Sequence, residues 1–175
     1  MYQLLPDEKT TPVMVYTQNQ LYRGDVVTKQ KIRVSIWLRS EGAPEYLHLL
    51  KAQAITLNCS PARALNLAEI YVPTSQALCF HMTPPDHDPM DYDETEKNRV
   101  MQPVVVQVGT FILNGFLRVS TQVDLGTSIS SNVRVSWFSL YHTKISNPNL
   151  PQMGEMPVPM LLVRPTQVAF GLANP

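Results

Sequence analysis

The densest group of side chains of metal-binding type lies in one short segment. Asp86, His87, Asp88, Asp91 and Asp93 bring four carboxylates and one imidazole close together along the chain. Carboxylate oxygens suit hard divalent cations, but the segment lacks the glycine and the terminal glutamate of an EF-hand loop. Prolines in the same stretch also restrict how the chain can wrap around an ion. We therefore interpret the segment as a solvated acidic linker, with a divalent metal site as the alternative.

A group of basic residues is the second candidate site. Arg23, Lys29, Lys31 and Arg33 could contact phosphate groups, as on a nucleic-acid-binding surface. The chain has 14 basic and 14 acidic residues and a formal net charge of zero, whereas proteins that bind nucleic acid usually carry a basic excess. A solvated strand face is the preferred interpretation, and a surface for an anionic partner is the alternative.

Nothing in the sequence predicts an enzyme or a cofactor. His48, His81, His87 and His142 form neither an HxH nor an HExxH pattern. The chain also lacks GxSxG, P-loop and GxGxxG motifs. We expect the histidines at the surface or at strand edges. The two cysteines are not spaced as metal ligands, and we expect them to be reduced thiols of a cytoplasmic protein.

The elements that must position these residues occur twice. Residues 12–82 and 103–173 align without gaps at an offset of 91, with apolar positions matching apolar positions. Gly24 and Gly115 are the glycines shared by the two copies, and each interrupts a strand pattern, so we predict a β-bulge or sharp bend at both. A repeat of this length indicates two copies of one small domain. The basic group belongs to the first copy alone.

The periodicity of each copy predicts about five short strands. Apolar and polar residues alternate, as in half-buried strands. The segment 46–57 also fits a helical period, but its counterpart 133–145 is rich in β-branched and aromatic residues, so we predict a strand for both. The segments predicted as strands are 13–17, 21–27, 32–38, 46–57, 67–72 and 76–82 in the first copy, and 133–145, 159–163 and 167–172 in the second.

These elements define a domain plan. We predict a polar lead-in at 1–11, a first barrel at 12–82, an acidic, proline-rich linker at 83–102 and a second barrel at 103–173. The proline- and methionine-rich segment 148–159 is a further candidate for a loop that contacts a partner. No N-terminal stretch has the apolar core of a signal peptide, and no apolar run approaches the length needed to cross a bilayer. We expect no membrane partner.

The strand order and the glycines resemble those of the Sm-like or SH3-like small barrel. In that superfamily an apolar-x-apolar motif precedes a glycine, and a final strand follows a tight turn. Val13-x-Val15 with Gly24, and Val104-x-Val106 with Gly115, are similar to the first motif, and residues 72–80 resemble the second. The resemblance implies an all-β fold of two tandem five-stranded barrels. The base-contacting Asp-x-x-apolar-Asn of RNA-binding Sm proteins does not occur after Gly24 or Gly115, and the Arg-Gly of their second motif is missing.

More narrowly, the chain resembles an uncharacterised bacterial family of tandem Sm-like barrels. The shared segments are Val15-Tyr16-Thr17, residues 33–38 and residues 46–52. We therefore expect a non-enzymatic interaction or scaffold protein that associates with itself, as a homo-oligomer or through pseudo-symmetric pairing, or with another protein. By analogy with Sm-like rings, three chains could close a ring of six barrels. An RNA- or nucleic-acid-binding regulator of Sm-like type is the alternative, disfavoured by the neutral charge.

Overall fold

The computed structural model describes residues 2–57, 59, 61–131 and 135–172, and this part of the chain is all-β. Ten strands, of three to eleven residues each, are present in these residues. Met1, Val133 and Ala173, which begin or end predicted segments, lie outside them. The strands are β1 (Glu8–Tyr16), β2 (Gln20–Lys29), β3 (Tyr46–Thr56), β4 (Arg63–Pro73), β5 (Cys79–Met82), β6 (Arg99–Val108), β7 (Phe111–Ser120), β8 (Phe138–Ser146), β9 (Met156–Val163) and β10 (Ala169–Gly171).

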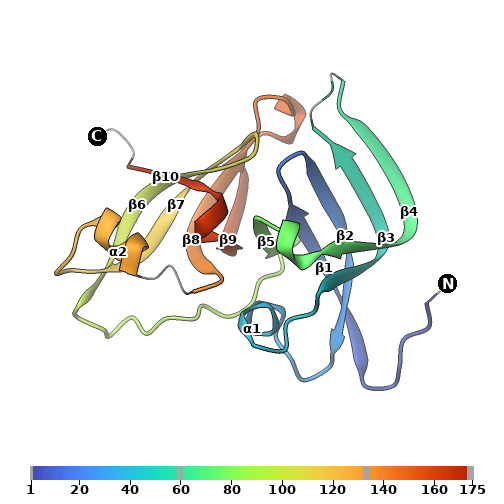
Figure 1. Ribbon diagram of the computed structural model, residues 1–175, viewed down its shortest axis with the longest axis horizontal. Coiled ribbons are helices and arrows are strands. Elements are labelled where there is room, and N and C mark those ends of the chain that lie inside the picture. Colours follow the sequence, from blue (N-terminus) through green and yellow to red (C-terminus); the bar gives the residue numbers. More distant parts are fainter. Residues whose placement is uncertain (1, 58, 60, 132–134, 173–175) are drawn as a thin grey trace.

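All ten strands belong to one open antiparallel sheet in the order β10-β6-β7-β8-β9-β5-β1-β2-β3-β4. We call β1–β5 the first half and β6–β10 the second half. Within each half the fifth strand pairs with the first, and the other four follow in chain order. Figure 1 shows the halves side by side, with β5 and β9 at the centre. The prediction of an all-β chain is therefore confirmed.

Both predicted bulges are present, at equivalent places. The β2–β3 register shifts between Arg23 and Asp25, and the β7–β8 register shifts between Asn114 and Phe116, so each shift spans a shared glycine. The extra residue lies on the facing strand, where Lys51 and His142 have positive φ angles of 48° and 47°. A side chain on either glycine would press into this facing strand.

The predicted strand at 32–38 is wrong, because these residues include a short helix. Helix α1 (Val34–Arg39) connects β2 to β3, and α2 (Leu125–Ser131) occupies the same place in the second half. Val34 and Leu38 are four residues apart, so one face of a helix buries both, as it does here. Alternation of apolar residues at every second position includes this i, i+4 pair, and the sequence pattern therefore fits either element. Single 3₁₀ turns occur at Thr74–Gln76 (η1), Pro151–Met153 (η2) and Pro165–Gln167 (η3).

The boundaries of the other predicted segments shift modestly. The polar lead-in is shorter than expected, since β1 begins at Glu8, and the linker ends where β6 begins at Arg99. Within 133–145 the described strand begins only at Phe138. Trp137 is buried, but Tyr46 at the equivalent position is 53% exposed.

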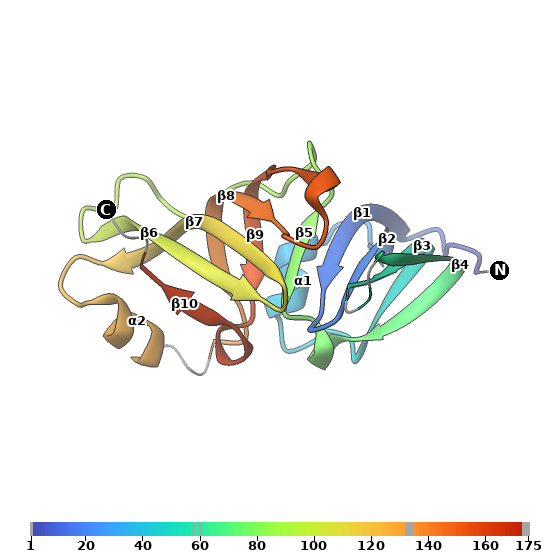
Figure 2. The same cartoon turned by 90° about the horizontal axis from the view of Figure 1, so that it is seen from above.

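The hydrophobic core runs through the boundary between the halves. One cluster joins Tyr16 and Cys79 of the first half to Val106 and Phe111 of the second, and Tyr16 packs edge-on against Phe111 with ring centroids 4.7 Å apart. A second cluster centred on the first half includes Leu162 from β9. Figure 2, seen from above, shows the halves meeting along this boundary. No helix in the described ranges is long and apolar enough to span a membrane.

Candidate functional site

The boundary between the halves is built on backbone pairing at the edges of two strands. β5 pairs with β9, with Cys79 opposite Val163 and Phe80 opposite Leu162. β5 also pairs with β1 on its other side, so this four-residue strand joins the two halves of the sheet. An edge strand offers unpaired N–H and C=O groups to any complementary strand, and here the fourth strand of one half meets the fifth strand of the other.

Arg164 fastens this boundary at the end of β9. Its backbone N–H donates to the Leu78 carbonyl at 2.8 Å. Its guanidinium donates through Nε to the Ala77 carbonyl at 3.0 Å and through Nη2 to the Thr74 carbonyl at 2.8 Å. The guanidinium carbon also lies 4.5 Å from the centre of the Trp137 ring. A single side chain of the second half thereby satisfies carbonyls in the η1 turn of the first half.

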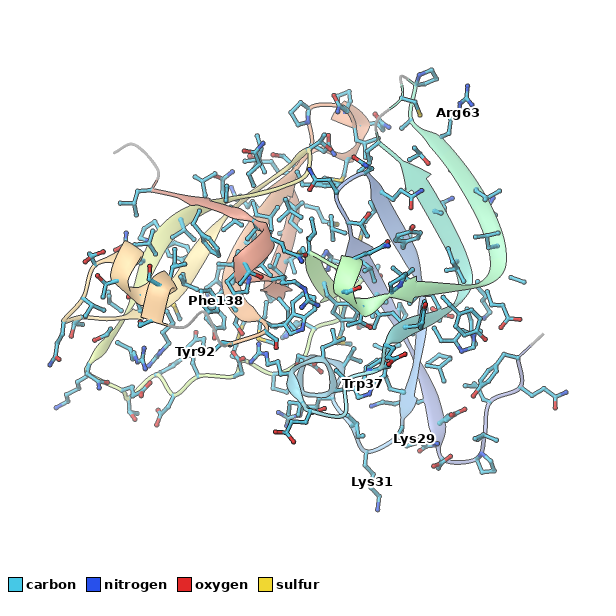
Figure 3. The ribbon with its side chains drawn as sticks, in the orientation of Figure 1. Lys29, Lys31, Trp37, Arg63, Tyr92 and Phe138 are labelled. Carbon is cyan, nitrogen blue, oxygen red and sulfur yellow. The ribbon has the colours of Figure 1, made fainter. Side chains whose placement is uncertain are left out.

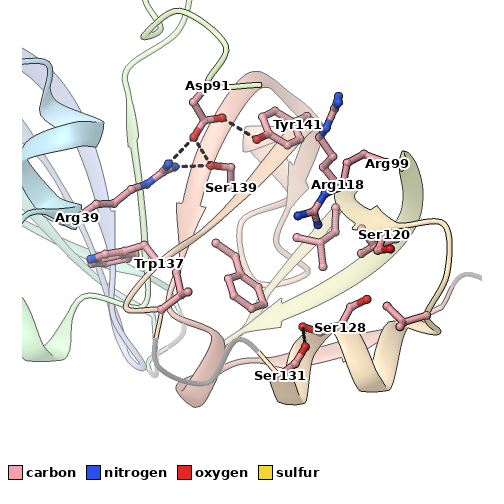
Figure 4. Close-up of a pocket in the computed structure, with 15 residues that line it drawn as sticks. Arg39, Asp91, Arg99, Arg118, Ser120, Ser128, Ser131, Trp137, Ser139 and Tyr141 are labelled. Carbon is pink, nitrogen blue, oxygen red and sulfur yellow. Dashed lines mark hydrogen bonds and ion pairs between the residues drawn. The ribbon is translucent and has the colours of Figure 1, made fainter. Parts of the chain in front are cut away.

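A polar cluster around Asp91 connects the linker to both halves (Figure 4). Arg39, the last residue of α1, donates to the Asp91 carboxylate and to the Ser139 hydroxyl. Ser139 Oγ donates to Asp91 Oδ2 at 2.8 Å, and the Tyr141 hydroxyl donates to Asp91 Oδ1 at 2.6 Å. The carboxylate therefore accepts hydrogen bonds from α1 in the first half and from β8 in the second.

The protonation states in this cluster follow from its geometry. Burial alone would raise the pKa of Asp91, but hydrogen bonds from Tyr141, Arg39 and Ser139 outweigh it and lower that pKa below its ordinary value. Burial and the hydrogen bond to Asp91 raise the pKa of Tyr141 above its ordinary value. At neutral pH the carboxylate is ionised and the phenol is a donor, so the cluster is an anchor with no free acid or base.

The other predicted metal ligands also bond to the protein, but at separate places. Asp88 Oδ2 accepts the Ser35 N–H at the start of α1, at 2.9 Å, and Asp93 Oδ1 accepts from Thr95. Asp86 and His87 are exposed. The described residues contain no group of three or more histidine, cysteine, aspartate or glutamate side chains able to hold a metal ion. Asp88 and Asp91 attach the linker to the rest of the protein, and the hydrogen bonds of Asp93 to Thr95 stay within the linker.

The four predicted basic residues are exposed but do not form one surface. Arg23 lies in the middle of β2 and Lys29 at its end, so roughly 20 Å of strand separates them. Lys29 is paired with Asp7 at 3.0 Å and Glu8 at 3.5 Å. Lys31 points away from the body of the protein (Figure 3), and Arg33 is the residue before α1. The charge of Lys29 is therefore balanced by acidic residues of the protein itself.

A pocket of about 420 Å³ lies beside the Asp91 cluster, lined by residues of the linker, β6, β7, β8 and α2. Three arginines reach its wall: Arg39 from the first half, Arg99 from β6 and Arg118 from β7. Figure 4 shows Arg99 and Arg118 at one end, and Arg39 at the other. Asp91 is the carboxylate among its lining residues. The pocket is therefore lined by more positive than negative charge.

His81 is fully buried, which contradicts its expected position at the surface. Its Nδ1 lies 2.7 Å from the Met82 carbonyl, so this nitrogen carries the proton and donates. Its Nε2 lies 2.8 Å from the Tyr16 hydroxyl and accepts from it. Burial lowers the pKa of His81 to about 4. The pair lies between β1 and β5, next to the boundary of the halves, and it stays neutral at physiological pH.

Sequence reasoning missed Arg99, Arg118, Tyr141 and Arg164, because none belongs to a recognisable motif. The repeat did contain a signal: at an offset of 91, Arg99 aligns with the acidic Glu8 and Arg118 with the uncharged Val27. Comparison with known protein families, curated proteins and solved structures finds no match to this chain.

Proposed function

We propose that this protein is a non-enzymatic assembly protein made of two tandem five-stranded small barrels of Sm-like type, and that it associates with itself through its two outer strands. The observation that carries the proposal is the pairing of β9 with β5. The same two strand types, β4 of the first half and β10 of the second, are left at the open ends of the sheet. Copies of the chain can therefore pair head to tail.

The 91-residue offset predicts the register of this contact. At an offset of 91, Phe170 and Gly171 of β10 correspond to Cys79 and Phe80, the two β5 residues that pair with β9. Val72 and Tyr71 of β4 correspond to Val163 and Leu162, the two β9 residues that pair with β5. In the contact between copies, Phe170 would lie opposite Val72, and Gly171 opposite Tyr71. Because the contact is heterologous, it continues from chain to chain until it closes into a ring or stops.

Exposed apolar side chains near both outer strands support this contact. Tyr46, Leu65 and Tyr71 on β3 and β4 are each more than half exposed. At the other end, Leu172 just after β10 is 59% exposed. Apolar surface gathered at a sheet edge is typical of an interaction surface.

The contact between copies should be weaker than the internal one. Pro73 of β4 corresponds to Arg164 of β9. The Arg164 N–H donates to the Leu78 carbonyl at the internal boundary, whereas proline has no N–H to make the same bond between copies. The guanidinium bonds of Arg164 also have no counterpart. The internal pairing further benefits from covalent linkage, which raises the effective concentration of the two edges. We expect association that depends on protein concentration.

The test is the mass in solution by light scattering over a range of concentrations, for the wild type and two variants at Tyr71. In β9 the backbone N–H groups of Leu162 and Arg164 point toward β5. Tyr71 of β4 corresponds to Leu162, so its N–H points to the outer side of the sheet, away from β3. Tyr71→Pro removes this outward N–H and leaves the β3–β4 hydrogen bonds in place. Tyr71→Ala removes the ring that stacks on His48 at 4.3 Å but keeps the N–H.

We expect the wild type and Tyr71→Ala to exceed the monomer mass of 19.7 kDa as concentration rises, and Tyr71→Pro to remain there. Gly171→Pro blocks the opposite edge and should also give a monomer. Mixed together, the two proline variants should form a dimer and nothing larger, since each retains one intact edge. Thermal melting of each variant checks that it is folded.

A wild type that stays monomeric at the highest concentration would overturn the proposal, as would a mixture of proline variants that forms no dimer. Absorbance at 260 and 280 nm on the same peak tests the nucleic-acid alternative. Nucleic acid that co-purifies, and is released when Lys31 and Arg33 are reversed in charge, would favour that alternative.

A further inference from the structure

We propose that the pocket lined by Arg99 and Arg118 binds a small organic oxyanion, a phosphate or carboxylate carried on an apolar body. This site is independent of the strand pairing proposed above, since it lies away from the outer edges of β4 and β10. Its volume of about 420 Å³ falls in the range of small-molecule sites.

The sheet brings the basic and hydroxyl groups of the pocket to one face. Arg99 stands opposite Ser120 in the β6–β7 register, and Arg118 lies two residues before Ser120. Side chains two residues apart on a strand point to the same side, so both guanidinium groups and the hydroxyl can reach the same space. Figure 4 shows all three at the same end of the pocket.

Arg118 has a donor left over. Its Nη2 donates to the Asp93 carbonyl and to Glu96 Oε2, and its guanidinium carbon lies 4.8 Å from the centre of the Tyr92 ring. Its Nε is buried and has no partner in the part of the chain that the structure describes. An atom that solvent cannot reach is also closed to a ligand, so Arg118 contributes positive charge to the pocket wall and not this donor.

The remaining groups favour a negative ligand. No hydrogen bond or ion pair within the described residues engages the Arg99 side chain. Ser120 Oγ accepts from the Gln122 N–H at 3.2 Å, which leaves the hydroxyl proton for a ligand. The nearby acid, Asp91, already accepts three side-chain hydrogen bonds. Its repulsion of an anion is reduced because Arg39 compensates its charge.

The other half of the protein shows that the fold does not require these groups. Glu8 and Lys29 pair in the β1–β2 register as Arg99 and Ser120 do in β6–β7, and in the first half these two side chains form an ion pair. At the place of Ser128 in α2, helix α1 carries Trp37, which packs against the core. The arginines and the small residue that leaves room for a ligand are therefore particular to the second half.

The apolar part of the wall indicates what the oxyanion is attached to. Leu117, Val119, Val123, Val135 and Phe138 contribute to the same pocket. Leu117, Val119 and Phe138 already pack in the core, but Val123 and Val135 are 41% and 43% exposed. Inorganic phosphate alone would leave these two side chains exposed, whereas an aromatic or aliphatic body would cover them. We therefore expect an organic anion to bind more tightly than the bare ion.

The experiment is isothermal titration calorimetry of the full chain with phenyl phosphate, benzoate, inorganic phosphate and the neutral benzyl alcohol. Arg99→Gln removes the unpaired cation, and Lys97→Gln is the matched control, since Lys97 is exposed in the same segment and does not line the pocket. We expect saturable binding of phenyl phosphate or benzoate, weakened on the order of tenfold or more by Arg99→Gln and unchanged by Lys97→Gln.

The tighter of the two aromatic anions identifies the headgroup as phosphate or carboxylate. Three results would overturn the proposal: no saturable binding of either anion, equal binding of benzyl alcohol, or equal weakening by both substitutions. No hydrogen bond or ion pair within the described residues holds the Arg99 side chain, so loss of binding with an unchanged melting temperature can be assigned to the site.

Discussion

Acidification should destabilise this protein through His81, a buried histidine beside the boundary of the two halves. In the unfolded chain a histidine has an ordinary pKa near 6.5, and in the folded protein burial lowers the pKa of His81 to about 4. Protons therefore bind preferentially to the unfolded chain between these two values. The stabilisation is complete above pH 6.5, decreases as pH falls toward 4, and changes little below that.

The pKa difference sets the size of the effect. Its full value corresponds to a loss of about 3 kcal/mol of unfolding free energy, of which about 2 kcal/mol is lost between pH 7 and pH 5. Carboxylates of ordinary pKa stay mostly ionised in this window, so the histidine contribution dominates it. The structural cause is the burial of the ring, which disfavours its charged form, whereas the hydrogen bond from Nδ1 to the Met82 carbonyl opposes the shift and is outweighed. The Tyr16 hydroxyl donates to Nε2 and so uses the lone pair that a proton would need.

The assay is urea unfolding at pH 7 and pH 5, followed by tryptophan fluorescence. His81→Gln removes the titrating ring and retains an acceptor for Tyr16, so its unfolding free energy should change little between the two pH values. His87→Gln removes an exposed histidine of the linker and should lose as much stability as the wild type. A wild-type loss below about 0.5 kcal/mol, or an equal loss in His81→Gln, would refute the reasoning.

Two further substitutions test the bulge and the linker. Gly115→Val should destabilise the protein by about 3 kcal/mol in thermal or urea unfolding, because a Cβ there would lie 2.5 Å from Thr143 Oγ1. Gly42→Ala should change stability little, because the nearest atom to its added Cβ is 3.8 Å away. Similar stability of the two variants would contradict this reasoning. Asp91→Asn should lower the free energy of unfolding in urea by about 1–2 kcal/mol, because it weakens the hydrogen bonds between the linker and the two halves. Asp86 is exposed, so Asp86→Asn should leave the stability unchanged. Equal stability of the two variants would show that Asp91 contributes nothing.

Much of the fold could be predicted from local patterns. Alternation marked most of the strands because each strand buries one face. Gly24 and Gly115 were located as bulges because only a residue without a side chain fits against the facing strand there. The helix at 34–39 was mistaken for a strand because its two buried residues, four apart, also fit alternation at every second residue.

The candidate sites could not be predicted in the same way. The acids of 86–93 were recognised as a group by their closeness in sequence, but Asp88 and Asp91 turn to different partners, Ser35 and Arg39, that lie far away along the chain. His81 was expected at the surface or at a strand edge because it belongs to no motif, but its ring is buried and bonded to Tyr16 of β1 and to the Met82 carbonyl.

The sequence by itself determined most of the strands and the two bulges, because these depend on residues close together or on a fixed offset. Only the tertiary structure decided that β5 pairs with β9, that Arg164 bonds to carbonyls of the other half, and that Arg99 and Arg118 line one pocket. Such contacts depend on the relative position of whole strands, which the packing of the shared core fixes and which no local pattern encodes.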